Sequence, residues 1–241
     1  MFVSVWTSYL SELVPEKDEK LITNLDNLSK KYELVLLSNY FEMVQLASWI
    51  TKLQPRFAGA TAYLAWNMAY NISVTCSDFA DRWRWVNEGI RLIRDRALIY
   101  NPEDPVLYKE LAWIFQHKLG NVLDDANLLY KNRLGMQMTN ILATGTPDWE
   151  ALAAAPKSKE EFLALYPADH KLWQAAAELG YKDFPQLFLA FKNVVPAQLP
   201  DALAAKLGEE EFKKVDNFMR AELLRERMKL EPSKILELDK K

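Results

Sequence analysis

Two tryptophans that stand 47 residues apart, Trp66 and Trp113, are the side chains whose type and spacing most clearly suggest a binding surface. Each ends the same triplet, Leu-Ala-Trp, so the two segments form an internal repeat. Aromatic side chains that recur at one register of a helical repeat supply apolar anchors for a peptide. The alternative is that another helix of the chain covers them. The candidate protein-binding residues are Tyr63, Trp66, Tyr70, Lys109, Trp113, Gln116 and His117.

A second group of residues interleaves arginine with tryptophan in the run Arg82-Trp-Arg-Trp85. Arginines beside aromatic rings can bind phosphates and stack on bases, so Arg82, Arg84 and Arg91 form a candidate anion-binding set. Acidic residues intervene, however, and the net charge of −3 with a pI of about 5.6 is unlike that of a phosphate-backbone binder. We therefore expect the tryptophans to pack in the core, the arginines to pair with nearby carboxylates or with solvent, and nucleic acid not to be the partner.

Residues for catalysis or metal binding are scarce. The two histidines, His117 and His170, do not have the spacing of paired metal ligands, and the single cysteine, Cys76, excludes an internal disulfide. The sequence contains no nucleophile elbow, phosphate-binding loop or glycine-rich dinucleotide motif. It therefore predicts no catalytic residue, no metal and no cofactor.

Helices must position these side chains, because apolar residues recur at spacings of three and four, and good helix formers dominate. Seven glycines are few for 241 residues, and the eleven prolines fall between the periodic stretches. The sequence predicts an all-α fold. Helices are expected near 5–14, 20–37, 40–53, 57–73, 79–99, 105–118, 122–141, 147–154, 158–165, 168–179, 184–194, 199–206 and 209–230.

The repeated segments resemble tetratricopeptide repeats, in which pairs of helices stack into an array. In the second segment the match lies at Tyr108, Leu111, Ala112 and Phe115, followed by Ala126 and Tyr130 on the next helix. The unit that closes at Pro102 has 47 residues rather than 34, which implies a longer helix or an inserted turn. The chain is most similar to a group of bacterial tetratricopeptide-like proteins, and this resemblance brings no activity with it.

The resemblance implies close helix packing at the small residue of each triplet, so Ala65 and Ala112 should both be buried. The resemblance covers about residues 22–140, and the sequence as a whole predicts four regions: an N-terminal apolar helix (1–21), tetratricopeptide-like helical repeats (22–142), a C-terminal helical cap (143–232) and a flexible tail (233–241). The expected function is a protein-binding scaffold or subunit of a larger assembly, which uses the groove of the array. The alternatives are a small-ligand binder or enzyme with a cavity between repeats and C-terminal helices, and a nucleic-acid-binding repeat protein.

The N-terminal segment Met1–Val14 carries an apolar stripe, formed by Val3, Trp6, Leu10 and Leu13. No stretch of the sequence has the length and apolar character of a transmembrane helix. We expect the stripe to cap the first repeat, or to dock on a partner or at a membrane surface. The expected location is the cytoplasm, with peripheral membrane contact through Met1–Val14 as the alternative.

Overall fold

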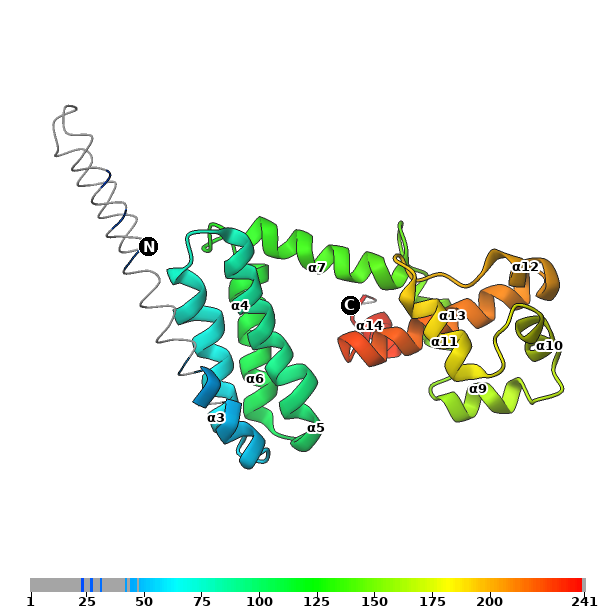
Figure 1. The fold of residues 1–241 in the computed structure, drawn as a ribbon, viewed down its shortest axis with the longest axis horizontal. Helices are drawn as coiled ribbons and strands as arrows, with labels where there is room; N and C mark the ends of the chain where they lie inside the picture. The colour runs from blue at the N-terminus through cyan, green and yellow to red at the C-terminus, as the bar shows by residue number, and fades with distance from the viewer. Residues whose placement is uncertain are drawn as a thin grey trace. The chain divides into compact units, whose positions relative to one another are not determined.

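The computed structural model describes Thr23, Asn27, Lys31, Glu42, Val44–Leu46 and residues 48–239, which contain helices and no strand (Figure 1). The expected all-α class is therefore confirmed for this part of the chain. The helices belong to two compact units, Met1–Asn132 and Arg133–Lys241. The segment Met1–Val14, with its expected cap or membrane role, lies outside the described residues.

The first unit repeats a helical pattern in which an α-helix widens into a π-helical segment. Helix α3 (Ala58–Trp66) continues into η1 (Asn67–Ile72), and a short 3-10 turn, η2 (Ser73–Thr75), follows. Helix α6 (Pro105–Ile114) continues likewise into η4 (Phe115–Gly120). These two helices begin 47 residues apart, at 58 and 105, so the spacing of the Leu-Ala-Trp triplets is also a spacing of structure.

The helices between and after these two complete the first unit. Helix α4 (Phe79–Arg91) continues through the π-helical η3 (Leu92–Ala97) into α5 (Leu98–Tyr100). Aspartates cap α4 and α6, because Asp78 and Asp104 accept hydrogen bonds from first-turn amides. Helix α7 (Asn127–Leu142) starts five residues later than expected, since Asp124 accepts from the Ala126 amide in the loop that precedes it.

Helices α3 and α4 pack closely at one point, where Gly89 lies against the backbone of Ala65. A Cβ atom at position 89 would stand only 2.7 Å from the Ala65 carbonyl oxygen, and Ala65 is fully buried. The expected burial of Ala65 is confirmed. The expected burial of Ala112 is wrong: α6 packs against α3 and η3, and its Ala112 side is exposed. The two alanines therefore share a sequence pattern but not a packing role.

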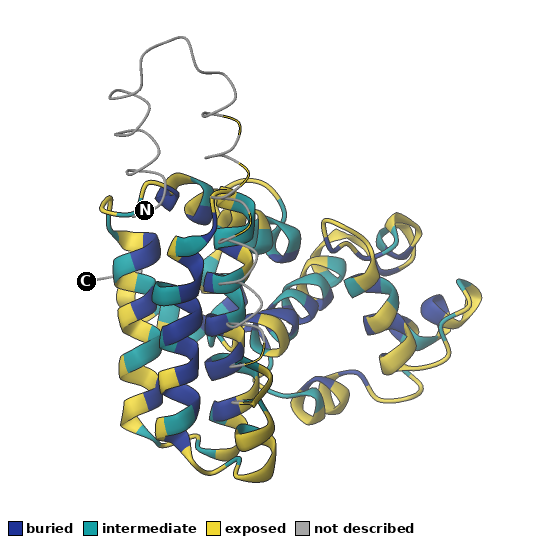
Figure 2. Cartoon of the chain, turned by 60° about the vertical axis from the view of Figure 1, so that its left-hand side comes forward, coloured by how far each residue is buried: buried dark blue, intermediate teal, exposed yellow. Residues whose placement is uncertain are grey.

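The second unit has a core rich in aromatic side chains. Figure 2 shows the buried residues along its helices in dark blue. The rings of Phe162 and Phe218 stack with centroids 4.1 Å apart and an angle of 7° between them, and both side chains are fully buried. Phe184, Phe188 and Phe191 join this core. The helices that surround it are α8 (Trp149–Ala154), α9 (Lys159–Leu165), α10 (Lys171–Glu178), α11 (Phe184–Asn193), α12 (Asp201–Leu207) and α13 (Glu209–Met228).

The two units divide within α7, where Leu134 and Met138 pack against the second core and Ile141 is part of it, whereas the expected repeat region ends at residue 142. The segment 233–241, expected as a flexible tail, instead forms helix α14 (Pro232–Asp239) over most of its length and packs against α8. The Arg225 guanidinium, 2.9 Å from the Glu231 carboxylate, fixes the turn that leads into α14.

Candidate functional site

Three of the expected binding residues form a row of stacked aromatic rings along α3 and η1. Trp66 lies between Tyr63 and Tyr70, with ring centroids 6.3 Å and 5.7 Å away, and both pairs are stacked. The residues follow one another at spacings of three and four, so a helix places them on one face. Tyr63 is 65% exposed, whereas Trp66 and Tyr70 are half-buried.

The neighbouring helix α6 carries the second part of the site. The ring of Trp113 lies 4.0 Å from that of His117, in the π-helical η4. The Tyr70 hydroxyl donates a hydrogen bond to the Trp113 carbonyl oxygen at 3.2 Å, which joins the two helices. Trp113 is 44% exposed, so the described residues leave much of its side chain accessible. We call these residues the aromatic surface: Tyr63, Trp66, Tyr70, Trp113 and His117.

The two remaining expected residues, Lys109 and Gln116, are exposed on α6 and η4. Sequence reasoning missed Glu110, which stands three residues before Trp113 and seven before His117 and therefore shares their helix face. One of its carboxylate oxygens is buried without a hydrogen-bond partner. Burial raises the pKa of this carboxyl, against a smaller opposing effect of Lys109. Burial, with a contribution from Glu110, raises the pKa of Tyr70 to about 12.

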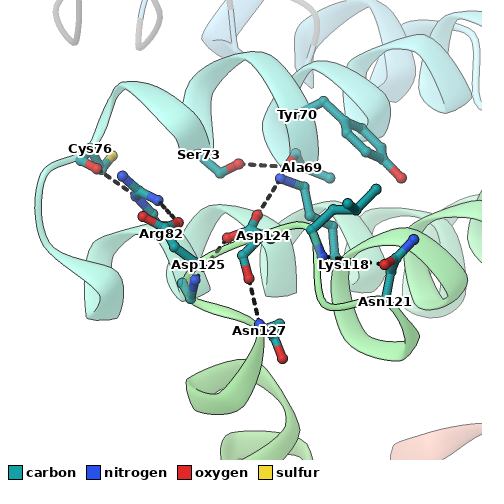
Figure 3. A network of polar contacts seen from close by, with 12 residues as sticks. Ala69, Tyr70, Ser73, Cys76, Arg82, Lys118, Asn121, Asp124, Asp125 and Asn127 are labelled. Carbon is teal, nitrogen blue, oxygen red and sulfur yellow. Dashed lines mark hydrogen bonds and ion pairs between the residues drawn. The ribbon is translucent and has the colours of Figure 1, made fainter. Parts of the chain in front are cut away.

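A network of ion pairs supports one end of the aromatic surface (Figure 3). The buried Lys118 ammonium lies 2.7 Å from the Asp124 carboxylate and 5.0 Å from the centre of the Tyr70 ring. Burial alone would raise the pKa of Asp124, but hydrogen bonds from Lys118 and the Ala126 amide, with nearby positive charge, lower it. A small cavity of about 250 Å³ opens here, lined in part by Tyr70, His117 and Lys118.

The arginines of the candidate anion site each lie beside a carboxylate. Arg82 contacts Asp125 at 2.5 Å and also donates to the Cys76 carbonyl oxygen, whereas Arg84 contacts Asp81 at 2.8 Å. Arg91 lies 3.6 Å from Glu88 and 3.8 Å from Asp95. Of the two tryptophans in this run, Trp83 is buried against Tyr130, and Trp85 is half-buried. The arrangement matches the expected pairing of arginines with carboxylates.

Within the described part of the chain, no cluster of three or more histidine, cysteine or acidic side chains has the geometry to hold a metal ion. None of the helices described there combines the length and apolar character needed to cross a bilayer. Comparisons with protein-family models, with curated proteins and with solved structures returned no match. The geometry of the aromatic surface is suited to holding a partner by ring contacts and a few polar groups.

Proposed function

We propose that the first unit is a tetratricopeptide-like helical repeat module that binds an extended peptide segment of another protein on the aromatic surface. The observation that carries the proposal is the hydrogen bond from Tyr70 to the Trp113 carbonyl oxygen. This bond joins the aromatic residues of α3 and η1 to those of α6 and η4, so that they form one surface. The 47-residue spacing of α3 and α6 supports the repeat interpretation.

The exposure of the rings supports a binding role over a purely structural one. Trp113 and Tyr63 keep 44% and 65% of their accessible surface, although their rings already stack on His117 and Trp66. Stacking on a neighbour restricts the motion of a ring, so little conformational entropy is lost when a partner covers it. Tryptophan and tyrosine dominate the residues on which binding energy concentrates at protein interfaces.

The polar groups around the rings favour an extended peptide over a bare apolar patch on a partner. Lys109 and Gln116 are exposed, four residues before and three residues after Trp113, and Glu110 adds a partly buried carboxylate three residues before it. Such groups can meet the backbone amides and carbonyls of a peptide whose side chains lie on the rings. The second unit, whose core phenylalanines are buried, then serves as a separate folded region of the same scaffold.

The test is selection of peptides from a random display library on the full chain, followed by affinity measurement with the purified variants. Trp113→Ala should weaken binding of the selected peptides about 30-fold, the equivalent of ~2 kcal/mol for an interface anchor. Tyr100→Ala, which removes an aromatic ring 57% exposed outside this surface, is the matched control and should change affinity less than twofold. Circular dichroism should show both variants folded.

Two results would contradict the proposal. One is a library that yields no peptide with measurable affinity. The other is a set of peptides that bind the folded Trp113→Ala protein as tightly as the parent, since binding would then take place on another surface.

A further inference from the structure

At one end of the aromatic surface, a ring and a carboxylate already hold a cation that comes from the chain itself. The Lys118 ammonium lies 2.7 Å from the Asp124 carboxylate and 5.0 Å from the centre of the Tyr70 ring. The face of an aromatic ring attracts a cation, and a carboxylate beside the ring adds a Coulomb attraction that is strong where water is excluded. This pair of groups shows what a second such pair on the same surface could hold.

The second carboxylate is that of Glu110, the sixth residue of α6. The sixth residue of α3 is Tyr63, so the 47-residue repeat places a carboxylate on α6 where α3 has a ring. One carboxylate oxygen of Glu110 is buried, whereas the half-buried side chain leaves the other accessible. Within the described residues, Glu110 makes neither a hydrogen bond nor an ion pair, so its negative charge is not matched inside the protein.

Aromatic rings lie close to this carboxylate. Trp113 follows Glu110 by three residues on the same helix face and is 44% exposed. Across the contact between α3 and α6, the charge of Glu110 contributes to the raised pKa of Tyr70, whose hydroxyl donates to the Trp113 carbonyl oxygen. No lysine or arginine of the described residues lies over the ring of Trp66 or Trp113. The second pair of ring and carboxylate therefore has no cation from the described chain.

The positive groups nearby do not fill this position. Lys109 is adjacent to Glu110 in the chain, but it is exposed and makes no ion pair with the carboxylate within the described structure. His117 stacks on Trp113 with ring centres 4.0 Å apart and still leaves much of the indole open. The charge of Lys118 is matched by Asp124. An unpaired, partly buried carboxylate costs stability, and a cation that reaches it from outside removes that cost.

We infer that the anchor of the bound peptide is a basic side chain, arginine or lysine, held between the Glu110 carboxylate and the Trp113 ring. This inference rests on the proposed function, because it names the peptide side chain that the aromatic surface holds. A guanidinium can stack on an indole and donate to a carboxylate at the same time, and an ammonium can make both contacts as a point charge. The net charge of −3 on the chain also favours a basic partner.

The test compares two peptide display libraries on the full chain. Every peptide of the first library carries arginine or lysine at its central position, and no peptide of the second contains either residue. The first library should yield peptides that bind at least tenfold more tightly than the best of the second. Replacing the central arginine by citrulline, or the central lysine by acetyllysine, keeps the length of the side chain and removes its charge. This replacement should weaken binding about tenfold, as expected for the loss of a charged hydrogen bond.

A pair of variants assigns the effect to one carboxylate. Glu110→Gln should bind the basic peptide about tenfold more weakly than wild-type protein, yet bind the citrulline or acetyllysine peptide as tightly as wild type does. Glu103→Gln is the matched control, because it removes an exposed carboxylate just before α6 and changes the net charge equally. It should alter the affinity for either peptide less than twofold. Circular dichroism should show both variants folded.

The possible failures separate this inference from the proposed function. Peptides without basic residues that bind tightly, and that lose affinity in Trp113→Ala, would keep the proposed function and overturn the inference. Equal affinity of Glu110→Gln and wild-type protein for the basic peptide would also overturn it. If neither library yields a peptide that binds, the proposed function and the inference fail together.

Discussion

Aromatic side chains stack in both units of the molecule, but they do so in opposite environments. In the second unit, Phe162 and Phe218 stack while fully buried. In the first unit, Trp113 and Tyr63 stack on His117 and Trp66 while still substantially exposed. The same ring chemistry therefore stabilises a core in one unit and remains accessible in the other. Burial, rather than residue type, separates the structural rings from the candidate binding rings.

The largest expected effect tests the structural side of this comparison. Phe162→Ala should lower the free energy of unfolding of the second unit by ~3–5 kcal/mol, because it leaves a cavity among Phe184 and Phe218. This loss of stability is measured by urea unfolding, in which the hydrogen exchange of the α13 amides reports on the second unit. Trp113→Ala should leave those same amides unchanged. If both substitutions destabilise α13 equally, the contrast between the two sets of rings is wrong.

A smaller effect compares two glycines that lie in helices of the two units. Gly89→Ala should destabilise the first unit by ~1–3 kcal/mol, because its new methyl group would stand 2.7 Å from the Ala65 carbonyl oxygen and push the helices apart. Gly135→Ala should instead stabilise by roughly 0.5–1 kcal/mol, since nothing lies within 4 Å of its Cβ position and alanine favours a helix. Thermal unfolding of the two variants shows whether each substitution raises or lowers the stability of the protein. Equal shifts would refute the close α3–α4 contact.

The smallest expected effect concerns Glu110 and depends on pH. The raised pKa of Glu110 means that the folded state disfavours the ionised carboxyl. The contribution of Glu110 to folding stability is therefore greatest at pH values below 4.5, the usual pKa of the group, and it is lost as the pH rises through the raised pKa. Glu110→Gln should therefore stabilise the protein at pH 7. A fully buried unpaired group would cost about 1–3 kcal/mol, and partial exposure reduces the expected gain to about 0.5 kcal/mol.

Urea unfolding at pH 7, 5.5 and 4 should show the advantage of Glu110→Gln shrinking as the pH falls. Glu103→Gln removes an exposed carboxylate near the start of α6 and serves as the control, with no change in stability at any of these pH values. An advantage that grows toward pH 4 would show that the carboxylate is stabilised in the folded protein, contrary to its unpartnered position.

Much of the helical framework could be predicted from the sequence, because capping residues and apolar periodicity are local signals. Ser158, for example, accepts a hydrogen bond from the Glu161 amide at 3.2 Å, and a serine three residues before a glutamate is a local capping pattern. The exposure of Ala112 could not be predicted in the same way, because it depends on which helix lies beside α6. The order of α14 was likewise missed, since its contact with α8 is made by residues about 80 positions apart in the chain.

The candidate site was predicted in part. The aromatic residues were found because tryptophan recurs with the repeat, and the structure brings Tyr70 and Trp113 together by a hydrogen bond. Glu110 gave no such signal, because a glutamate on a helix is ordinarily solvated. Its burial arises only when α3 and α6 pack side by side. Local spacing can thus identify the rings of this surface, whereas the charge among them depends on tertiary packing.

The π-helical segments have a consequence for the direction of side chains. A π turn closes its hydrogen bond over one more residue than an α turn, so each residue turns the chain through a smaller angle about the helix axis. The side chains of Tyr70 in η1 and His117 in η4 therefore point in directions that differ from those that α-helical spacing alone would give.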